Sequence, residues 1–269
     1  MSSTKILFAN DDGIYADGIN QLYNHLNSIS GYECYMVAPS EERSTTGHSL
    51  SLTSPLRVKK LNDFKYSCSG FPADCVLVGL GHVFKDVDFD LVISGINHGA
   101  NLGQDLFYSG TIAAAREATY QGVPAIATSQ ILSSDVDADY LIGSKVIQFF
   151  LEQGVHKKIK PQNLLNINFP SVNNLSDIKG IKVTDIGYQK YTGDIITRED
   201  FRGQKYIWVG GHYKGFEEVP GTDCYESAQG YISLVLQNTF CHDNRELHHE
   251  MNSFVEQIES EFQKFKASS

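Results

Sequence analysis

Two adjacent carboxylates follow a short apolar run near the start of the chain. Residues 6–9 (ILFA) carry no polar alternation, which predicts a strand buried on both faces, and Asn10, Asp11, Asp12 and Gly13 come directly after it. Neighbouring carboxylates repel each other unless positive charge lies between them, and oxygen ligands suit hard ions such as Mg²⁺ or Mn²⁺. A divalent-metal site is therefore a candidate here, and a plain polar turn is the alternative.

Two further polar segments each follow a predicted strand. Residues 40–52 are rich in hydroxyl groups and include Ser44 and His48. Residues 95–103 are rich in glycine and include Asn97. Because the carboxyl ends of parallel strands meet at one edge of a sheet, we expect these segments to meet the carboxylate pair there.

A helix start completes the set of candidate groups. Ser109, Gly110 and Thr111 lead into the run AAAREA, and Asn101 lies shortly before them. Serine is a favoured N-cap, and the exposed N–H groups of a helix start attract phosphate. Plain helix capping explains the same residues, so this signal is weak on its own.

The elements that must position these groups alternate between strand and helix. This order predicts an α/β fold with a mostly parallel sheet. Strands are expected at 6–9, 34–38, 56–60, 65–69, 90–94, 123–129 and 164–170, and helices at 17–30, from Pro72, after Ser109 and around 140–150. These patterns leave two function classes open, namely metal-assisted phosphate chemistry and non-catalytic ligand binding.

The texture of the sequence changes after about Gly180. Short alternating segments broken by glycine predict antiparallel hairpins, so residues 181–240 are expected to form a hairpin arm on the 1–180 core. The aromatic residues of this arm fit either hairpin packing or a subunit contact. Residues 241–269 predict a terminal amphipathic helix.

Composition narrows the class of protein. The chain has 269 residues and a formal net charge of −10, which disfavours binding to a nucleic-acid polymer or a membrane surface. Five cysteines without a CxxC pair favour reduced thiols over a disulfide framework. With no predicted signal peptide or membrane span, a cytoplasmic location is expected.

Five segments in fixed order resemble the SurE (survival protein E) family. They are NDDGI at 10–14, APSEERSTTGHSLSL at 38–52, SGINHGANLGQDLFYSGT at 94–111, LLNINFP at 164–170 and GTDCYESAQGYISL at 221–234. The resemblance implies one SurE-like domain over 1–269, with a three-layer, Rossmann-like, mostly parallel sheet. It also implies a homodimer or homotetramer.

The resemblance further implies a divalent-metal-dependent phosphatase that acts on nucleoside monophosphates. One Mg²⁺ or Mn²⁺ per subunit would be held by Asp11, Asp12, Ser44 and Asn97. The phosphate would be bound by Asn10, Asn101, Ser109, Gly110 and Thr111. The chain departs from the family at Phe71, where a Thr is usual, and at Ala118, where a Gly is common. The first departure leaves the preferred base open.

The predicted reaction is direct attack of a metal-activated water on a phosphomonoester. Asp11 and Asp12 are the predicted catalytic carboxylates. A phospho-aspartate route ranks lower, because the two acids are adjacent and not spaced by one residue. His48 and His98 are candidate general acids, although a loop histidine is more often a surface residue. Three alternatives stay open, namely a nucleotide-sensing or assembly protein without turnover, a broader phosphatase or exopolyphosphatase, and hydrolysis of 3′ as well as 5′ esters.

Overall fold

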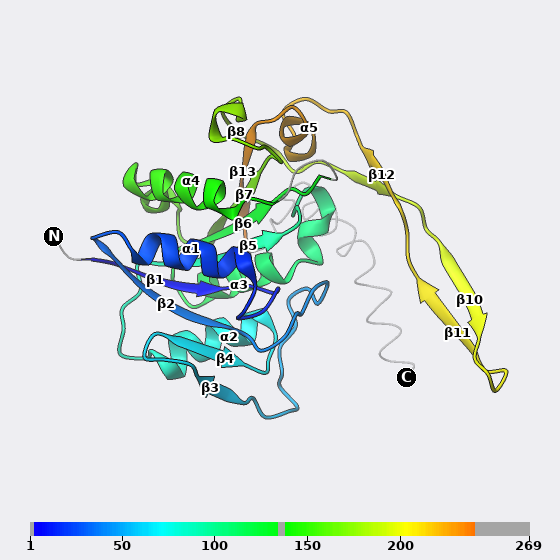
Figure 1. Cartoon of the computed structure of the whole chain (residues 1–269), viewed down its shortest axis with the longest axis horizontal. Helices are drawn as coiled ribbons and strands as arrows, with labels where there is room; N and C mark the ends of the chain where they lie inside the picture. Colours follow the sequence, from blue (N-terminus) through cyan, green and yellow to red (C-terminus); the bar gives the residue numbers. More distant parts are fainter. Residues whose placement is uncertain (1–2, 134–137, 240–269) are drawn as a thin grey trace, which may run out of the picture. The chain divides into compact units, whose positions relative to one another are not determined.

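The computed structural model of the chain describes residues 3–133 and 138–239, which belong to one compact unit. The terminal helix predicted over 241–269 lies outside the described residues. Figure 1 shows a central sheet with helices on both of its faces. The fold is the α/β class that the sequence predicts.

Nine strands form the main sheet, in the order β3-β4-β2-β1-β5-β6-β7-β13-β8. Their bounds are β1 Thr4–Ala9, β2 Tyr32–Pro39, β3 Val58–Lys60, β4 Lys65–Cys68, β5 Leu91–His98, β6 Ala125–Gln130, β7 Asn163–Phe169, β8 Ile181–Val183 and β13 Ile232–Asn238. The six strands from β4 to β7 run parallel, whereas β3 is antiparallel to β4 and β13 is antiparallel to β7.

The strand order reverses beside β1. From β1 the chain builds β2 and β4 on one side, and it then crosses to place β5, β6 and β7 on the other side. In open α/β sheets, ligands bind at such a switch point, outside the carboxyl ends of the strands. The ends of β1 and β5 are therefore the expected place for a site.

Helices cover both faces of the sheet. The helix α1 (Asp17–Asn27) packs on α4 (Tyr140–Glu152) over one face, and α2 (Pro72–Val78) packs on α3 (Gly110–Tyr120) over the other. Pro72 occupies the first turn of α2, as predicted. The remaining helical segments are a π-helical turn at Gly79–Val83, 3₁₀ turns at Gly103–Phe107, Val155–Lys158 and Leu175–Asp177, and α5 at Asp223–Ala228.

Strand β5 extends beyond its predicted end at residue 94. Its pairing with β6 shifts register between Ser94 and Asn97, where Gly95 has a φ of +120°. A Cβ on Gly95 would lie 2.2 Å from the carbonyl oxygen of Thr128, so only glycine fits the bulge. The bulge lets the strand continue to His98, and it carries Asn97 to the rim of the sheet.

The predicted hairpin arm over 181–240 is only partly correct. Strands β8 and β13 belong to the main sheet, where the alternation of β13 buries one face beside β7. A period of two predicts a strand without identifying its partner, which explains the error. The arm itself, named here the hairpin arm, spans residues 189–216.

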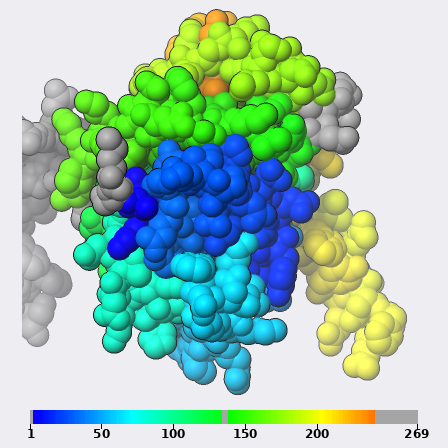
Figure 2. Space-filling model, turned by 60° about the vertical axis from the view of Figure 1, so that its left-hand side comes forward, coloured from blue at the N-terminus to red at the C-terminus, as the bar shows by residue number. Residues whose placement is uncertain are grey.

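Four strands build the hairpin arm in two short pairs. They are β9 Gln189–Tyr191 with β12 Tyr213–Phe216, and β10 Ile195–Glu199 with β11 Lys205–Val209. All residues of β10 and β11 are exposed. The yellow end of the arm stands out from the α/β body in Figures 1 and 2.

Two further predictions concern the described part of the chain. Within residues 3–133 and 138–239, no helix combines the length and the apolar character needed to cross a bilayer. The four cysteines in these ranges, Cys34, Cys68, Cys75 and Cys224, are all free and buried.

Candidate active site

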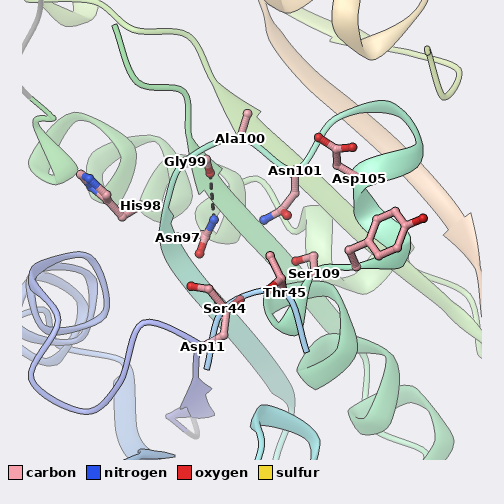
Figure 3. Close-up of a pocket in the computed structure, with 11 residues that line it drawn as sticks. Asp11, Ser44, Thr45, Asn97, His98, Gly99, Ala100, Asn101, Asp105 and Ser109 are labelled. Atoms are coloured by element: carbon pink, nitrogen blue, oxygen red, sulfur yellow. Dashed lines mark hydrogen bonds between the residues drawn. The ribbon is translucent and has the colours of Figure 1, made fainter. Parts of the chain in front are cut away.

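A pocket of about 460 Å³ opens at the carboxyl ends of β1 and β5, where the strand order reverses. It is lined by Asp11, Ser44, Thr45, Asn97, His98, Gly99, Ala100, Asn101, Asp105, Tyr108 and Ser109. Figure 3 shows Asp11, Ser44 and Asn97 gathered on one side of the pocket, with Asn101 and Ser109 beside them. The three polar segments predicted from the sequence therefore meet at one place.

Asp11 is the buried acid of the pair, with 4% of its surface exposed. Burial raises the pKa of its carboxyl group to about 6, and the charge of Asp12 adds to the rise. The hydroxyl and backbone N–H of Thr111 donate to the carboxylate and oppose that rise. The first turn of α3 thus supports negative charge on Asp11.

Asp12 is less buried and faces the end of β5. Its Oδ2 accepts a hydrogen bond from the backbone N–H of His98, at 3.0 Å. Burial raises the pKa of Asp12 as well, and this hydrogen bond opposes the rise. The acid does not line the pocket itself, but it lies next to Asp11 in the turn that closes β1.

Gly110 allows α3 to approach the acid pair closely. A Cβ on Gly110 would lie 2.7 Å from the Cβ of Asp11 and 2.9 Å from its Oδ2. Any larger residue would therefore force the helix start away from the carboxylate. Gly110 was predicted to contact phosphate, and the structure adds that its lack of a side chain admits Asp11.

Ser44 and Asn97 each hold an oxygen whose lone pairs are not used by a donor of the described chain. The hydroxyl of Ser44 donates to Glu42 Oε1 at 2.7 Å, which leaves the oxygen itself available. The amide Nδ2 of Asn97 donates to the carbonyl oxygen of Gly99 at 2.9 Å, and Figure 3 shows its oxygen on the side of Ser44. Both side chains are thus oriented to present oxygen.

The loop that carries Ser44 is tied to β1. The backbone N–H of Arg43 donates to the carbonyl oxygen of Asp11 at 2.7 Å, and Thr46 closes the loop by donating to the carbonyl oxygen of Arg43 at 2.8 Å. These bonds hold the hydroxyl segment next to the acid pair.

The donor set fits a hard divalent cation. Asp11, Asp12, Ser44 and Asn97 offer oxygen atoms alone, and burial raises the pKa values of the two carboxylates, which a bound cation would offset. Within the described ranges, no cluster of three or more His, Cys, Asp or Glu residues is arranged to hold a metal. The set therefore suits Mg²⁺ or Mn²⁺ better than zinc.

The opposite wall of the pocket is held by two asparagines of β7. Asn166 and Asn168 are fully buried, and their amide groups donate to the carbonyl oxygen of Asn101 at 2.9 and 3.0 Å. The Oδ1 of Asn168 accepts the backbone N–H of Asn101 at 2.8 Å. The side chain of Asn101 donates to Ser129 Oγ at 2.8 Å. Asn101 is consequently fixed at the pocket by four hydrogen bonds.

The N-cap predicted at Ser109 is confirmed. Its Oγ accepts the backbone N–H of Ile112 at 3.1 Å, and α3 begins at Gly110. Ser109 lines the pocket, whereas Thr111 is fully buried and turned to Asp11. For Thr111 the structure therefore favours the role of orienting the acid over direct contact with phosphate.

Asn10 is also placed differently from its prediction as a phosphate contact. It is fully buried, and its amide group donates to the carbonyl oxygen of Gly13 at 2.9 Å while its Oδ1 accepts the Gly13 N–H at 3.2 Å. Asn10 therefore shapes the turn that carries the two acids. A phosphate contact would require these bonds to break.

Of the two candidate general acids, His48 is held by residues of α3. His48 lies outside the pocket, where its Nε2 pairs with Glu117 Oε2 at 2.9 Å and its ring stacks on Tyr120. Burial alone raises the pKa of Glu117, but the bonds from His48 and Gln121 bring it below its usual value. His48 thus ties the 40–52 segment to α3, a structural role that the sequence did not indicate.

Five pocket residues were not assigned to the site from the sequence, and two of them are Gly99 and Ala100. Thr45 and Tyr108 line the pocket, although neither was singled out as a contact. Asp105 lines it too, and its Oδ2 accepts from Gln189 Nε2 at 2.7 Å and from the hydroxyl of Tyr191. That pairing supports a scaffolding role for Asp105, which joins the loop to β9. Tyr108 directly precedes the predicted N-cap Ser109, and this position was the sequence signal that could have placed it at the site.

Comparison with known proteins relates the chain to one family and agrees with this fold. The family described as Survival protein SurE matches residues 6–193. A protein of Paramagnetospirillum magneticum called 5′-nucleotidase SurE is 42% identical over 237 residues, which cover 87% of this chain and 89% of that protein. A protein of the same name from Vibrio cholerae is 40% identical, with 86% and 89% covered.

A solved structure extends the likeness to three dimensions. The crystal structure of a SurE protein from Aquifex aeolicus superposes with a TM-score of 0.81 at 32% identity, covering 93% of this chain and 99% of that one. An open α/β sheet with an acid pair at its switch point defines a class of Rossmann-like ligand-binding proteins. Within that class, the chain belongs to the SurE family.

Proposed function

We propose that this protein is a divalent-metal-dependent 5′-nucleotidase. One observation carries the proposal, namely that oxygen atoms of Asp11, Ser44 and Asn97 meet in one pocket at the switch point of the sheet. The names of its relatives support the substrate class, because proteins of Paramagnetospirillum magneticum and Myxococcus xanthus at 42% and 37% identity are both called 5′-nucleotidase SurE.

One set of residues is assigned to the metal ion and another set to the phosphate group. Asp11, Asp12, Ser44 and Asn97 would hold one Mg²⁺ or Mn²⁺, which when bound supplies charge neutralisation for the phosphoryl group and lowers the pKa of a water. Asn101, fixed from β7, and Ser109 at the start of α3 would orient the phosphate from the other wall.

A general acid for the leaving alkoxide is the part that the pocket supplies least directly. His98 is the single histidine among the lining residues, and its Nδ1 is 2.5 Å from the hydroxyl of Tyr140. We propose His98 for this role in preference to His48, which pairs with Glu117 outside the pocket, and the role requires the His98 ring to turn from Tyr140 toward Asn97.

Release of inorganic phosphate tests the proposal. The purified protein is incubated with AMP and GMP, with 3′-AMP as a further substrate, in EDTA and in Mg²⁺ or Mn²⁺. We expect release from the 5′ esters that depends on the added cation. A Ser44→Ala variant should need a higher cation concentration, because it loses one oxygen ligand.

Ser49→Ala is the matched control for that variant. Ser49 lies in the same loop, outside the lining of the pocket, and donates to the carbonyl oxygen of Thr46 at 2.6 Å. Its removal should leave the cation requirement unchanged. No release from any monophosphate with any cation would contradict the proposal and favour a nucleotide sensor. Equal release from short polyphosphate would indicate a broader phosphatase.

We also propose that the protein assembles through the hairpin arm, as a homodimer or a larger homo-oligomer. The apolar side chains of the arm are exposed, with Trp208 61% and Val209 83% accessible. Both partners of such an interface would be the same strand pair of two copies, which buries these side chains without a different protein. Light scattering on the full chain measures the mass directly.

A further inference from the structure

The pocket has very few aromatic groups to receive a nucleobase. Among its lining residues within the described chain, Tyr108 and His98 are the two with rings, and most of the others are small or polar. A base leaves water most readily when it can stack on an aromatic face. One of these two rings is therefore the candidate platform.

The ring of His98 is already engaged elsewhere. Its Nδ1 lies 2.5 Å from the hydroxyl of Tyr140, and the two ring centres are 6.4 Å apart. Figure 3 shows the side chain of His98 pointing away from Asn97, Asn101 and Ser109. Stacking a base there would require the ring to leave Tyr140.

The ring of Tyr108 has the opposite properties. It is 64% exposed, and its side chain makes no hydrogen bond, ring contact or ion pair with any residue in the described ranges. An exposed aromatic ring at the edge of a pocket, with no partner among residues 3–133 and 138–239, is typical of a ligand contact.

The backbone under this ring is nonetheless fixed. The N–H of Tyr108 donates to the carbonyl oxygen of Asp105 at 3.0 Å, and its own carbonyl oxygen accepts the N–H of Gly47 at 3.0 Å. The next residue, Ser109, is the N-cap of α3. The ring is thus held one residue from the proposed phosphate wall, which is within the reach of a nucleoside.

We propose that Tyr108 is the specificity-determining residue of this pocket, and that its ring stacks on the base of the nucleoside monophosphate. The inference rests on the proposed function and adds the part of the substrate that is recognised. Because stacking is tolerant of base identity, the residue selects nucleotides over sugar phosphates without selecting one base.

Comparison of AMP with ribose 5-phosphate, which lacks the base, tests the inference. In Tyr108→Ala, kcat/KM for AMP should fall about ten-fold or more through KM, whereas that for ribose 5-phosphate should stay within about two-fold. Tyr108→Phe should retain the value for AMP, because the ring is kept. Phe107→Ala is the matched control, since Phe107 is 58% exposed but does not line the pocket.

Calorimetric binding of an AMP analogue separates this inference from the proposed function. The analogue carries CH₂ in place of the ester oxygen, so that it binds without turnover. Weaker binding to Tyr108→Ala than to Phe107→Ala supports the inference even if the wild-type protein releases no phosphate.

Three results would overturn the inference. They are equal losses for AMP and ribose 5-phosphate, a Tyr108→Phe variant as impaired as Tyr108→Ala, and no binding of the analogue to the wild-type protein in Mn²⁺. A Tyr108→Ala variant that changes its mass in light scattering and loses both substrates equally would instead place the ring in a subunit contact.

Discussion

The pocket and the hairpin arm satisfy their side chains in opposite ways. At the pocket, polar groups such as Asp11 and Asn101 are about 95% buried and hydrogen-bonded to other elements. On the arm, apolar groups such as Ile207 and Trp208 are each 61% exposed. Burying polar groups is costly unless they are bonded, whereas exposing apolar groups is costly unless a partner covers them. Among the described residues, these polar groups of the pocket have hydrogen-bond partners, whereas these apolar groups of the arm are exposed.

This contrast predicts the largest effect at Asp11. Asp11→Asn removes a charged metal ligand, so phosphate release should fall more than about 100-fold at saturating Mn²⁺. The same change should stabilise the metal-free protein at pH 7, because the wild-type protein without a cation buries a carboxylate that no positive charge offsets. Thermal unfolding in EDTA measures the second effect, and Asp12→Asn offers a comparison at the less buried acid.

The pH dependence of that stability follows from the sign of the pKa shift. Burial raises the folded-state pKa of Asp11 to about 6, above the ordinary value of 3.8 for an aspartate. Folding therefore favours the protonated form, and metal-free stability should fall as pH rises from about 4 to about 6, by roughly 2–3 kcal/mol. Asp11→Asn should lack this fall. A wild-type curve in EDTA that is flat over this range would contradict the burial argument.

The second effect concerns the approach of α3 to the acids. Gly110→Ala places a methyl group 2.7 Å from the Cβ of Asp11, so the helix start must shift. We expect a loss of about 1–3 kcal/mol in the free energy of unfolding and at least a ten-fold loss of phosphate release. Gly81→Ala is the control, because a Cβ there meets nothing within 4 Å.

The third effect is on the wall held by β7. Asn168→Ala removes two hydrogen bonds to the backbone of Asn101 and leaves its buried N–H without an acceptor. The free energy of unfolding in urea should fall by about 1–3 kcal/mol. Asn163→Ala, at the opposite end of the same strand, should cost less than about 1 kcal/mol, since its side chain bonds only to the exposed turn before it.

The smallest effect on the single chain is expected on the arm. Trp208→Ser changes an exposed side chain, so the stability of one chain should change by no more than about 0.5 kcal/mol. The mass measured by light scattering should nevertheless fall, because the variant removes apolar area from the proposed interface. Leu175→Ser, at a 49% exposed position outside the arm, is the control. An unchanged mass for Trp208→Ser would remove the arm from the interface.

The sequence predicted best what depends on near neighbours. The apolar run before Asp11, the proline that opens α2 and the N-cap at Ser109 are local signals, and the structure confirms each of them. The meeting of the three polar segments at one edge of the sheet could also be predicted, because the carboxyl ends of parallel strands lie at the same edge. The segments that carry Asp11, Ser44 and Asn97 could therefore be expected to meet, whereas the choice of Ser44 and Asn97 as ligands came from the resemblance to the SurE family.

Distant pairings were the part that could not be predicted. His48 pairs with Glu117, which lies 69 residues further along the chain. Strand β13 pairs with β7, although its segment was predicted to belong to the hairpin arm. The local bonds of Asn10 to Gly13 were not anticipated either, because they depend on the geometry of one turn, and Asn10 was instead expected to contact phosphate. Composition and periodicity determine neither which strand another strand pairs with nor which polar partner a side chain selects.

The reversal of strand order beside β1 has a consequence for how the protein folds. Asp11 and Asn97 become neighbours only after β5 has joined β1, a parallel pairing that sets Ile6 beside Leu91. A chain that ends before residue 91 would therefore contain Asp11 and Asp12 without Asn97. A cation that binds this pocket would recognise the closed sheet alone, and its affinity would count toward the cooperative stability of the entire unit.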